Sequence, residues 1–263
     1  GLASGKGVFL PESPGEAGTI LESLMEGKSL GDAGSEVVIE ERLVGEELSL
    51  LGFCDGRNVR VMPPAQDHKR LLENDAGPNT GGMGAIALSG PEALAQVRAL
   101  ADRFLLGACR GLAEEGAPFV GTLYAGLIMT KEGPKALEYN CRFGDPETQA
   151  LLPLLESDLG EVMLACVQGR LDEYPLRWKQ GACATVVLAS EGYARDSGPD
   201  KPRAVADYGA GDDSYVFHGA TRTSPSGDIE AVGGRLLSVS AWADSLPAAS
   251  GAAYARLALI DLP

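Results

Sequence analysis

The sequence lacks the features that mark several large classes of protein. No apolar run approaches the length of a membrane-spanning helix, and we recognise no secretory signal peptide. The five cysteines are odd in number and form no C-x-x-C pair, which argues against a disulfide framework or a zinc site and for reduced thiols in a cytoplasmic protein. Positive charge is also scarce, and the formal net charge is −15. Because nucleic acids and anionic membranes attract positive charge, we expect neither as a partner.

The rest of the composition is that of a globular protein. Hydrophobic residues make up 44% of the chain and charged residues 22%. A length of 263 residues is enough to bury a substantial core and to form two domains. The 35 glycines are about twice the usual share, which predicts many turns and close backbone approaches.

The stretch from Leu137 to Gln149 is the most informative part of the chain. It continues from a β-hairpin predicted to begin at Thr122. Since side chains alternate across a strand, Glu138, Asn140 and Arg142 should project onto one face. Carboxylate and amide oxygens suit Mg²⁺, and a neighbouring guanidinium can hold a phosphate oxygen with two hydrogen bonds. A solvated polar sheet face has the same pattern, but the Gly-Asp-Pro-Glu run that follows favours a site.

Three stretches of the chain resemble one family. The sequence E-Y-N-C-R-F-G-D-P-E-T-Q at 138–149 is similar to the signature of phosphoribosylamine–glycine ligases, which are ATP-grasp enzymes of purine synthesis. Q-D-H-K-R at 66–70 with G-P-N-T-G-G-M-G-A at 77–85, and G-L-A-S-G-K-G-V at 1–8, agree with the same family in sequence and in spacing. The resemblance is dense over most of the chain and looser in its C-terminal third. It implies an α+β protein with the ATP-grasp fold.

The resemblance also implies a domain organisation. Residues 1–178 would form the ATP-grasp domain, with a partial lid at 1–41 and a catalytic core at 42–178, and residues 181–263 would form a small, truncated C-terminal α/β domain. In the family, a lysine-containing strand and a Rossmann-like domain precede the motif at which Gly1 stands. We therefore expect the chain to be an internal piece of a longer polypeptide.

The family match implies the residues that bind ATP and metal. Backbone groups of Glu40 and Leu43 would contact the adenine, and Glu47 would accept hydrogen bonds from the ribose hydroxyls. The full nucleotide-binding set is Gly5, Lys6, Gly7, Glu40, Glu41, Leu43 and Glu47. Glu138 and Asn140 would hold Mg²⁺ or Mn²⁺. Without the family match, the acidic run would be interpreted as a solvated turn, and G-K-G alone lacks the full P-loop pattern.

The match further implies where the substrates bind. Catalysis would rest on Arg142 and Lys69, which would stabilise the transferring phosphoryl group. The substrate-binding set is Asp67, His68, Asn79, Thr80, Gly81 and Asp145. Basic residues are gathered at 66–70 in an otherwise acidic chain, which favours an anion-binding role for that stretch. His68 lacks partners at metal-ligand spacing, and the glycine-rich segment 79–84 on its own would be an ordinary surface loop.

The implied reaction joins glycine to 5-phosphoribosylamine, with ATP converted to ADP and phosphate through a glycyl phosphate. Two alternatives remain open: an ATP-grasp ligase or carboxylase for another acid, and a non-catalytic module of a multifunctional purine enzyme. M-P-P-A-Q at 62–66 resembles the forms of the family that are fused to other purine-pathway domains. We expect residues 1–263 alone to be inactive, because the lid is incomplete.

Hydrophobic periodicity predicts the elements that carry these motifs. The predicted strands are 8–10, 36–41, 48–54, 58–62, 122–129, 135–137, 182–189, 215–222 and 235–242. The predicted helices are 14–26, a long helix from 91 to about 116, 148–155, 159–168 and 246–260.

Overall fold

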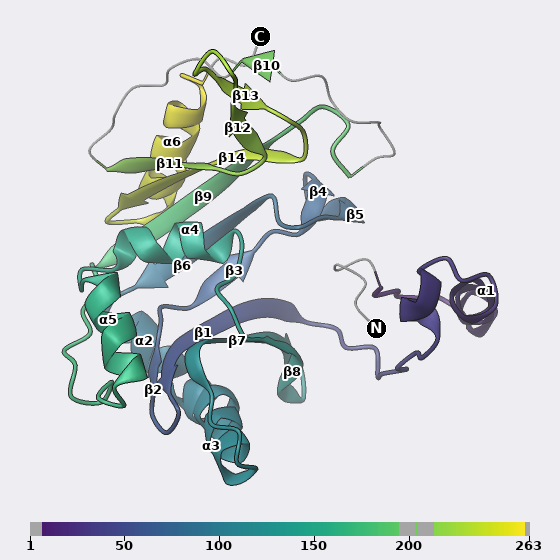
Figure 1. Ribbon diagram of the computed structural model, residues 1–263, viewed down its shortest axis with the longest axis horizontal. Coiled ribbons are helices and arrows are strands. Elements are labelled where there is room, and N and C mark those ends of the chain that lie inside the picture. Colours follow the sequence, from purple (N-terminus) through teal and green to yellow (C-terminus); the bar gives the residue numbers. More distant parts are fainter. Residues whose placement is uncertain (1–6, 195–202, 205–212, 261–263) are drawn as a thin grey trace. The chain divides into compact units, whose positions relative to one another are not determined.

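The structure is a computed structural model that describes residues 7–194, 203–204 and 213–260. The chain divides into two units, residues 1–44 and residues 45–263, which we describe separately. The second unit contains the main sheet and most of the helices (Figure 1). Among the described residues, none of the helices is both long and apolar enough to cross a membrane.

The first unit contains one α-helix, α1 (Pro14–Met25), and a 3₁₀ turn at Gly31–Gly34. The helix begins after Ser13, whose hydroxyl accepts a hydrogen bond from the amide of Glu16 at 3.2 Å. A serine cap followed by proline at the first helical position is a strong start signal. The helix predicted at 14–26 is confirmed.

The two strands predicted in the first unit are wrong. Residues 8–10 and 36–41 have no regular secondary structure, and their apolar side chains are exposed, except for the half-buried Val37. Val38 and Ile39 are each 81% exposed. The β-branched pattern fits a strand, but a strand also needs a neighbour for its backbone hydrogen bonds and cover for its side chains. The described part of the first unit provides neither.

The second unit is built on one large antiparallel sheet. Its order is β11-β14-β9-β6-β3-β1-β7-β8, with β2 beside β1 (Figure 1). The strands are β1 (Glu46–Asp55), β2 (Val59–Val61), β3 (Ala65–Asp67), β6 (Gly84–Ser89), β7 (Val120–Thr130), β8 (Gly133–Asn140), β9 (Gly181–Ala189), β11 (Ser214–His218) and β14 (Arg235–Ala243). Two small sheets complete the unit: β4 (Arg70–Leu72) with β5 (Ala76–Asn79), and β10 (Arg203–Ala204), β13 (Ile229–Ala231) and β12 (Thr221–Thr223).

Helices cover both faces of the central strands. They are α2 (Pro91–Leu100), which continues through a π-helical turn (Ala101–Leu106) into α3 (Gly107–Glu114), then α4 (Glu147–Leu151) with a 3₁₀ turn (Leu152–Leu154), α5 (Leu159–Val167) and α6 (Leu246–Leu257). Neighbouring residues of β1 point to opposite faces, as the strand period requires. Leu50 packs with Phe104 and Leu105 of the π-helical turn, whereas Leu51 packs with Leu151 of α4 and Val162 of α5.

The strands and helices predicted in this unit are confirmed, with differences at their ends, but hydrophobic periodicity does not predict the short strands β3, β4, β5, β6, β10 and β13. The N-cap of α2 is Gly90, and that of α5 is Asp158, whose carboxylate accepts from the amide of Glu161 at 3.0 Å. Ser157, which precedes this cap, donates to the carbonyl of Pro175 at 3.3 Å. The strand predicted at 215–222 is two strands: β11 ends at His218 in the large sheet, and β12 begins at Thr221 in the three-stranded sheet.

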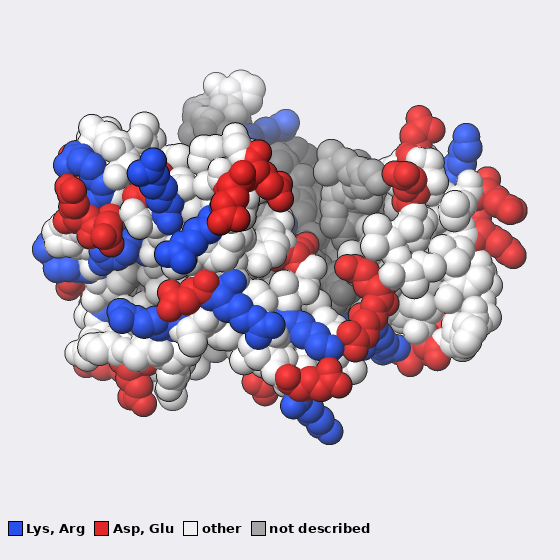
Figure 2. All heavy atoms as spheres, turned by 90° about the horizontal axis from the view of Figure 1, so that it is seen from below, with Lys and Arg blue, Asp and Glu red and all other residues white. Residues whose placement is uncertain are grey.

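The sheet is continuous across the predicted domain boundary. Strand β6, in the predicted ATP-grasp domain, pairs along its whole length with β9, in the predicted C-terminal domain. The division at 178–181 stays a prediction. On the face of the molecule shown in Figure 2, Lys and Arg side chains lie interspersed with Asp and Glu.

Candidate functional site

The side chains of Glu138 and Asn140 lie together on β8. This strand is at the edge of the sheet, and Leu137 is an extra residue opposite the step from Gly126 to Leu127 of β7. Beyond this bulge, the amide of Asn140 donates to the Glu138 carboxylate at 3.0 Å. The two oxygen-bearing side chains therefore share one face, as strand alternation predicts.

The opposite side of β8 is anchored to a helix. The hydroxyl of Tyr139 donates to the carbonyl of Phe104 at 3.1 Å, and Phe104 belongs to the π-helical turn. This contact holds the end of the edge strand against the helical layer. Glu138 stays exposed on the other face.

Lys69 lies near carboxylates from three strands and forms an ion pair with one of them. Its ammonium forms this ion pair with Glu47 of β1, and Lys69 itself lies two residues after the end of β3. Burial lowers the pKa of Lys69, but the hydrogen bond to Glu47 and the charges of nearby carboxylates raise it overall. Those carboxylates are Glu47, Asp67 of β3 and Glu138 of β8. Lys69 therefore keeps its charge at neutral pH and sits in an acidic environment.

Asp67 has an unusual environment for a carboxylate. Burial and the charge of Glu147 raise the pKa of Asp67 to about 7, against the opposing effect of Lys69. Its Oδ1 atom is buried and accepts no hydrogen bond from the described residues. An ammonium group placed against this atom would lower the pKa again and would supply the missing donor.

Glu147 is a member of the site, although the sequence assigned it no binding role. It opens α4, and its side chain is 3% exposed and turns inward. Its Oε1 accepts from the hydroxyl of Ser49 at 2.8 Å and from that of Tyr124 at 2.9 Å. The buried carboxylate is thereby satisfied, and its charge acts on the neighbouring Asp67.

The glycine-rich loop folds back over Lys69. Thr80 donates from both its amide and its hydroxyl to the carbonyl of Lys69, each at 2.8 Å. Gly82 has φ +107°, and a Cβ built on it would lie 2.4 Å from Cδ of Pro146 and 2.6 Å from Oδ1 of Asp67. No residue larger than glycine fits at this position, so the loop depends on it to approach both Asp67 and the turn at Pro146.

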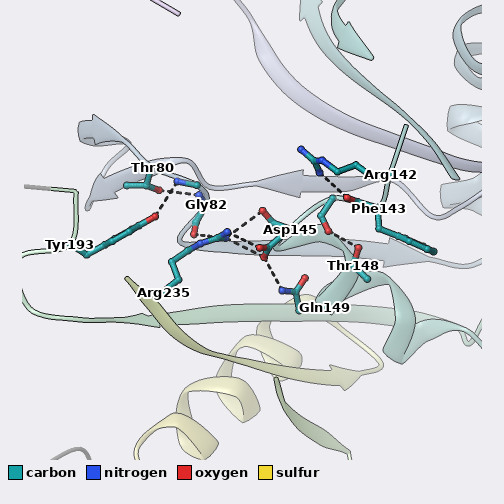
Figure 3. Close-up of polar contacts among 11 residues, drawn as sticks. Thr80, Gly82, Arg142, Phe143, Asp145, Thr148, Gln149, Tyr193 and Arg235 are labelled. Atoms are coloured by element: carbon teal, nitrogen blue, oxygen red, sulfur yellow. Dashed lines mark hydrogen bonds and ion pairs between the residues drawn. The ribbon is translucent and has the colours of Figure 1, made fainter. Parts of the chain in front are cut away.

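Asp145 is bound by an arginine that sequence reasoning did not assign to the site. Nη2 of Arg235 lies 2.6 Å from Oδ2 of Asp145, and Nη1 lies 3.2 Å from Oδ1 (Figure 3). Gln149 also donates to Oδ1, at 2.8 Å. Arg235 opens strand β14, after two glycines with positive φ. That pattern predicts a turn and a strand, and nothing in it indicates the long-range partner.

The other predicted site residues of this unit lie around the same loops. The guanidinium of Arg142 is exposed and donates to the carbonyl of its neighbour Phe143 at 2.7 Å (Figure 3). The side chains of His68 and Asn79 are exposed, and the backbone of His68 bonds with Met83 and Gly84. The arrangement brings Lys69, Glu47, Asp67 and Glu138 into one electrostatic neighbourhood.

The predicted nucleotide-binding residues are divided between the two units. Gly5 and Lys6 lie outside the described residues. Gly7, Glu40, Glu41 and Leu43 belong to the first unit, and only Glu47 belongs to the second. The assignment of this set stays a prediction.

The donor set on β8 fits a hard cation that is shared with a phosphate. Among the described residues, no group of three or more His, Cys, Asp or Glu side chains has the arrangement of a metal site. Glu138 and Asn140 instead offer one carboxylate and one amide oxygen. Mg²⁺ is commonly held in this way, by one or two protein oxygens together with substrate phosphates and water.

Two family models match the chain. They are "Phosphoribosylglycinamide synthetase, ATP-grasp (A) domain" over residues 1–148 and "Phosphoribosylglycinamide synthetase, C domain" over residues 183–263. The bifunctional purine biosynthetic protein ADE1 of Schizosaccharomyces pombe is 46% identical over 259 residues, which are 97% of this chain and 32% of that protein.

Two solved structures resemble the chain, one in sequence and fold and one in fold alone. The crystal structure of phosphoribosylamine–glycine ligase from Thermotoga maritima superposes with a TM-score of 0.81 at 31% identity, covering 100% of this chain and 64% of that one. The biotin carboxylase domain of 2-oxoglutarate carboxylase from Hydrogenobacter thermophilus, determined with MgADP and bicarbonate, has a TM-score of 0.63 at 14% identity, covering 95% and 53%. This second likeness concerns the fold alone. The chain thus spans less than two thirds of the length of these relatives.

Proposed function

The chain belongs to the phosphoribosylglycinamide synthetase family and has the ATP-grasp fold, and we propose that it carries the catalytic core of a ligase that joins glycine to 5-phosphoribosylamine. ATP would be converted to ADP and phosphate. The observation that carries the proposal is the grouping of Lys69 with the carboxylates of Glu47, Asp67 and Glu138. This grouping combines a partly exposed cation, oxygen ligands and a site for an ammonium group, all of which the reaction needs.

In the first step, a carboxylate oxygen of glycine attacks the γ-phosphorus of ATP, and ADP leaves. Phosphoryl transfer depends mainly on positioning and charge stabilisation. Lys69 and Arg142 would neutralise the transferring group, and Glu47 would exchange its ion pair with Lys69 for the ribose hydroxyls. Mg²⁺, held by Glu138 and Asn140, would offset the charge of the phosphates. Mn²⁺ in its place is a further proposal.

In the second step, the amine of 5-phosphoribosylamine attacks the carbonyl carbon of glycyl phosphate. The carbon–nitrogen bond forms, the bond to phosphate breaks, and the amine loses a proton. Asp67 would hold the ammonium of glycine, because its buried Oδ1 lacks a donor. Thr80, Gly81 and Asp145, with His68 and Asn79 at the rim, would orient the incoming amine and its sugar.

The test uses the full-length protein with ATP, freshly generated 5-phosphoribosylamine and a panel of acids. ADP release that depends on glycine, with glycinamide ribonucleotide identified by mass, is the expected result. ADP release with bicarbonate or another acid, and none with glycine, would replace this proposal by a different ATP-grasp ligase. Absence of turnover with every acid would favour a non-catalytic module. Fusion to other purine-pathway domains, as in the bifunctional relative, and a cytoplasmic location remain proposals for this chain.

A further inference from the structure

We propose that Arg235 is a positioning residue of the ligation site, which holds Asp145 and the glycine loop 80–82 in register on the side that receives the sugar amine. The inference rests on the proposed function. It adds a residue from the C-terminal part of the chain and the substrate whose binding should depend on it.

The geometry of Arg235 is that of a two-pronged carboxylate contact. Its two terminal nitrogens reach the two oxygens of Asp145 at 3.2 and 2.6 Å. Nη1 also lies 3.4 Å from the carbonyl oxygens of Gly82 and Asp145. The Arg235 side chain is 23% exposed, whereas that of Asp145 is 55% exposed. A planar fork on a carboxylate fixes orientation as well as distance, which a lysine cannot do.

Tyr193 contacts the glycine loop 80–82 on the same side as Arg235. Figure 3 shows Arg235 and Tyr193 on one side of the loop, directed toward it. The amide of Gly81 donates to the hydroxyl of Tyr193 at 3.3 Å, and a Cβ on Gly81 would lie 3.2 Å from Cζ of Arg235. The guanidinium thus lies against the Gly81 backbone. Arg235 meets Asp145, 90 positions away in the chain, and Gly82, 153 positions away.

The charge of Arg235 also acts on Asp67. Burial and the charge of Glu147, with that of Glu47, raise the pKa of Asp67, whereas the positive charges of Lys69 and, to a smaller extent, Arg235 lower it. The charged groups that face Asp67 are Glu47 of β1, Lys69 after β3, Glu147 of α4 and Arg235 of β14. Arg235→Lys separates the two properties of this side chain, because lysine retains the positive charge but lacks the planar guanidinium.

The contacts of Arg235 point to the sugar amine rather than to ATP. They are made with Asp145 and with the glycine loop, whereas the proposed nucleotide and metal ligands Glu47, Glu138 and Asn140 lie on β1 and β8. Displacement of the loop should therefore impair capture of the sugar amine more than binding of ATP. Small displacements of a reactant are known to cost orders of magnitude in rate.

The experiment compares Arg235→Met, Arg235→Lys and Asp145→Asn in the full-length protein. Arg235→Met is expected to raise the KM for 5-phosphoribosylamine by about tenfold or more, with the KM for ATP within about twofold of wild type. Arg235→Lys should show the same KM defect. Asp145→Asn combined with Arg235→Met should cost little more than either change alone, because the two residues act as one unit.

The pH profile separates positioning from a structural role. Loss of the positive charge raises the pKa of Asp67, whose ionised carboxylate would bind glycine. The acidic limb of the kcat/KM profile for glycine should therefore move to higher pH in Arg235→Met. It should stay in place in Arg235→Lys. Arg222→Met is the matched control, because it removes an exposed arginine–carboxylate pair with Glu230, at 3.1 Å, in the same part of the chain. It should leave all of these parameters unchanged.

The outcomes are distinguishable. If the wild-type protein forms no glycinamide ribonucleotide, the proposed function is wrong and the inference falls with it. If the wild type is active and Arg235→Met leaves the KM for the amine unchanged, or raises both KM values equally, only the inference is wrong. Should Arg235→Met fail to fold, the KM values of Arg235→Lys and Asp145→Asn decide the question: a raised KM for the amine with an unchanged KM for ATP supports the inference, and unchanged values for both overturn it.

Discussion

Residues 7–44 and residues 45–260 both carry parts of the same family motifs, yet their backbones are supported very differently. In the second unit every strand has a partner, and alternate residues of β1 are buried against helices on both faces. In the first, Val38 and Ile39 have strand-forming sequences but are exposed and unpaired with any described strand. An apolar β-branched segment thus forms a strand only where a second strand pairs with it, and the fold decides whether that strand is present.

Hydrogen exchange should give the largest difference between the two regions. Amides of residues 37–40 have no place in a described ladder, whereas those of Leu50 to Phe53 lie between paired strands. Opening of the central strands costs up to the global free energy of unfolding, so their protection should exceed that of 37–40 by about 10⁴-fold or more. Mass spectrometry of this chain measures it. Equal protection in both segments would show that 37–40 is a paired strand.

Truncation of one side chain in each region sharpens the comparison. Leu51→Ala opens a cavity between β1 and α4 and should lower the free energy of unfolding by about 2–5 kcal/mol. Ile39→Ala removes an exposed side chain and should change it by less than about 0.5 kcal/mol. Urea titrations of the two variants and the parent give both values. A loss of more than 2 kcal/mol in Ile39→Ala would mean that this segment is packed.

Glu138→Ala tests whether the second unit supplies the metal ligands. Removal of one oxygen ligand from a cation with strict octahedral demands should reduce turnover of the full-length protein by about 10²-fold or more, with the melting temperature unchanged. Glu132→Ala is the control, since it removes an exposed carboxylate from the turn of the same hairpin. Near-normal turnover of Glu138→Ala at saturating Mg²⁺ would take Glu138 out of the metal site.

Arg142→Lys should have the smallest effect of this series. The exposed guanidinium has one described bond, to the carbonyl of Phe143, so the protein should tolerate lysine without loss of thermal stability. If the planar fork binds the transferring phosphoryl group, kcat should still fall by about tenfold or more. Steady-state kinetics with saturating substrates measures it. Full activity would leave Arg142 with no role beyond its charge.

Local pattern was enough to predict much of the second unit. The hairpin of β7 and β8, the helices at 91–114 and 159–167, and the strands β9 and β14 all follow from hydrophobic periodicity and turn residues. The common face of Glu138 and Asn140 follows from the two-residue period of a strand. These features depend on residues close together in the chain, which is why the sequence alone determines them.

The tertiary structure decided how distant residues meet. Asp145 is fixed by Arg235, 90 positions away, and Glu147 is satisfied by Ser49 and Tyr124 from two other strands. It also decided that residues 8–10 and 36–41 do not form the predicted strands. Whether a strand pairs, whether a carboxylate is buried, and which charge lies beside it depend on the neighbours that the fold supplies. Those neighbours are not encoded in any single stretch of sequence.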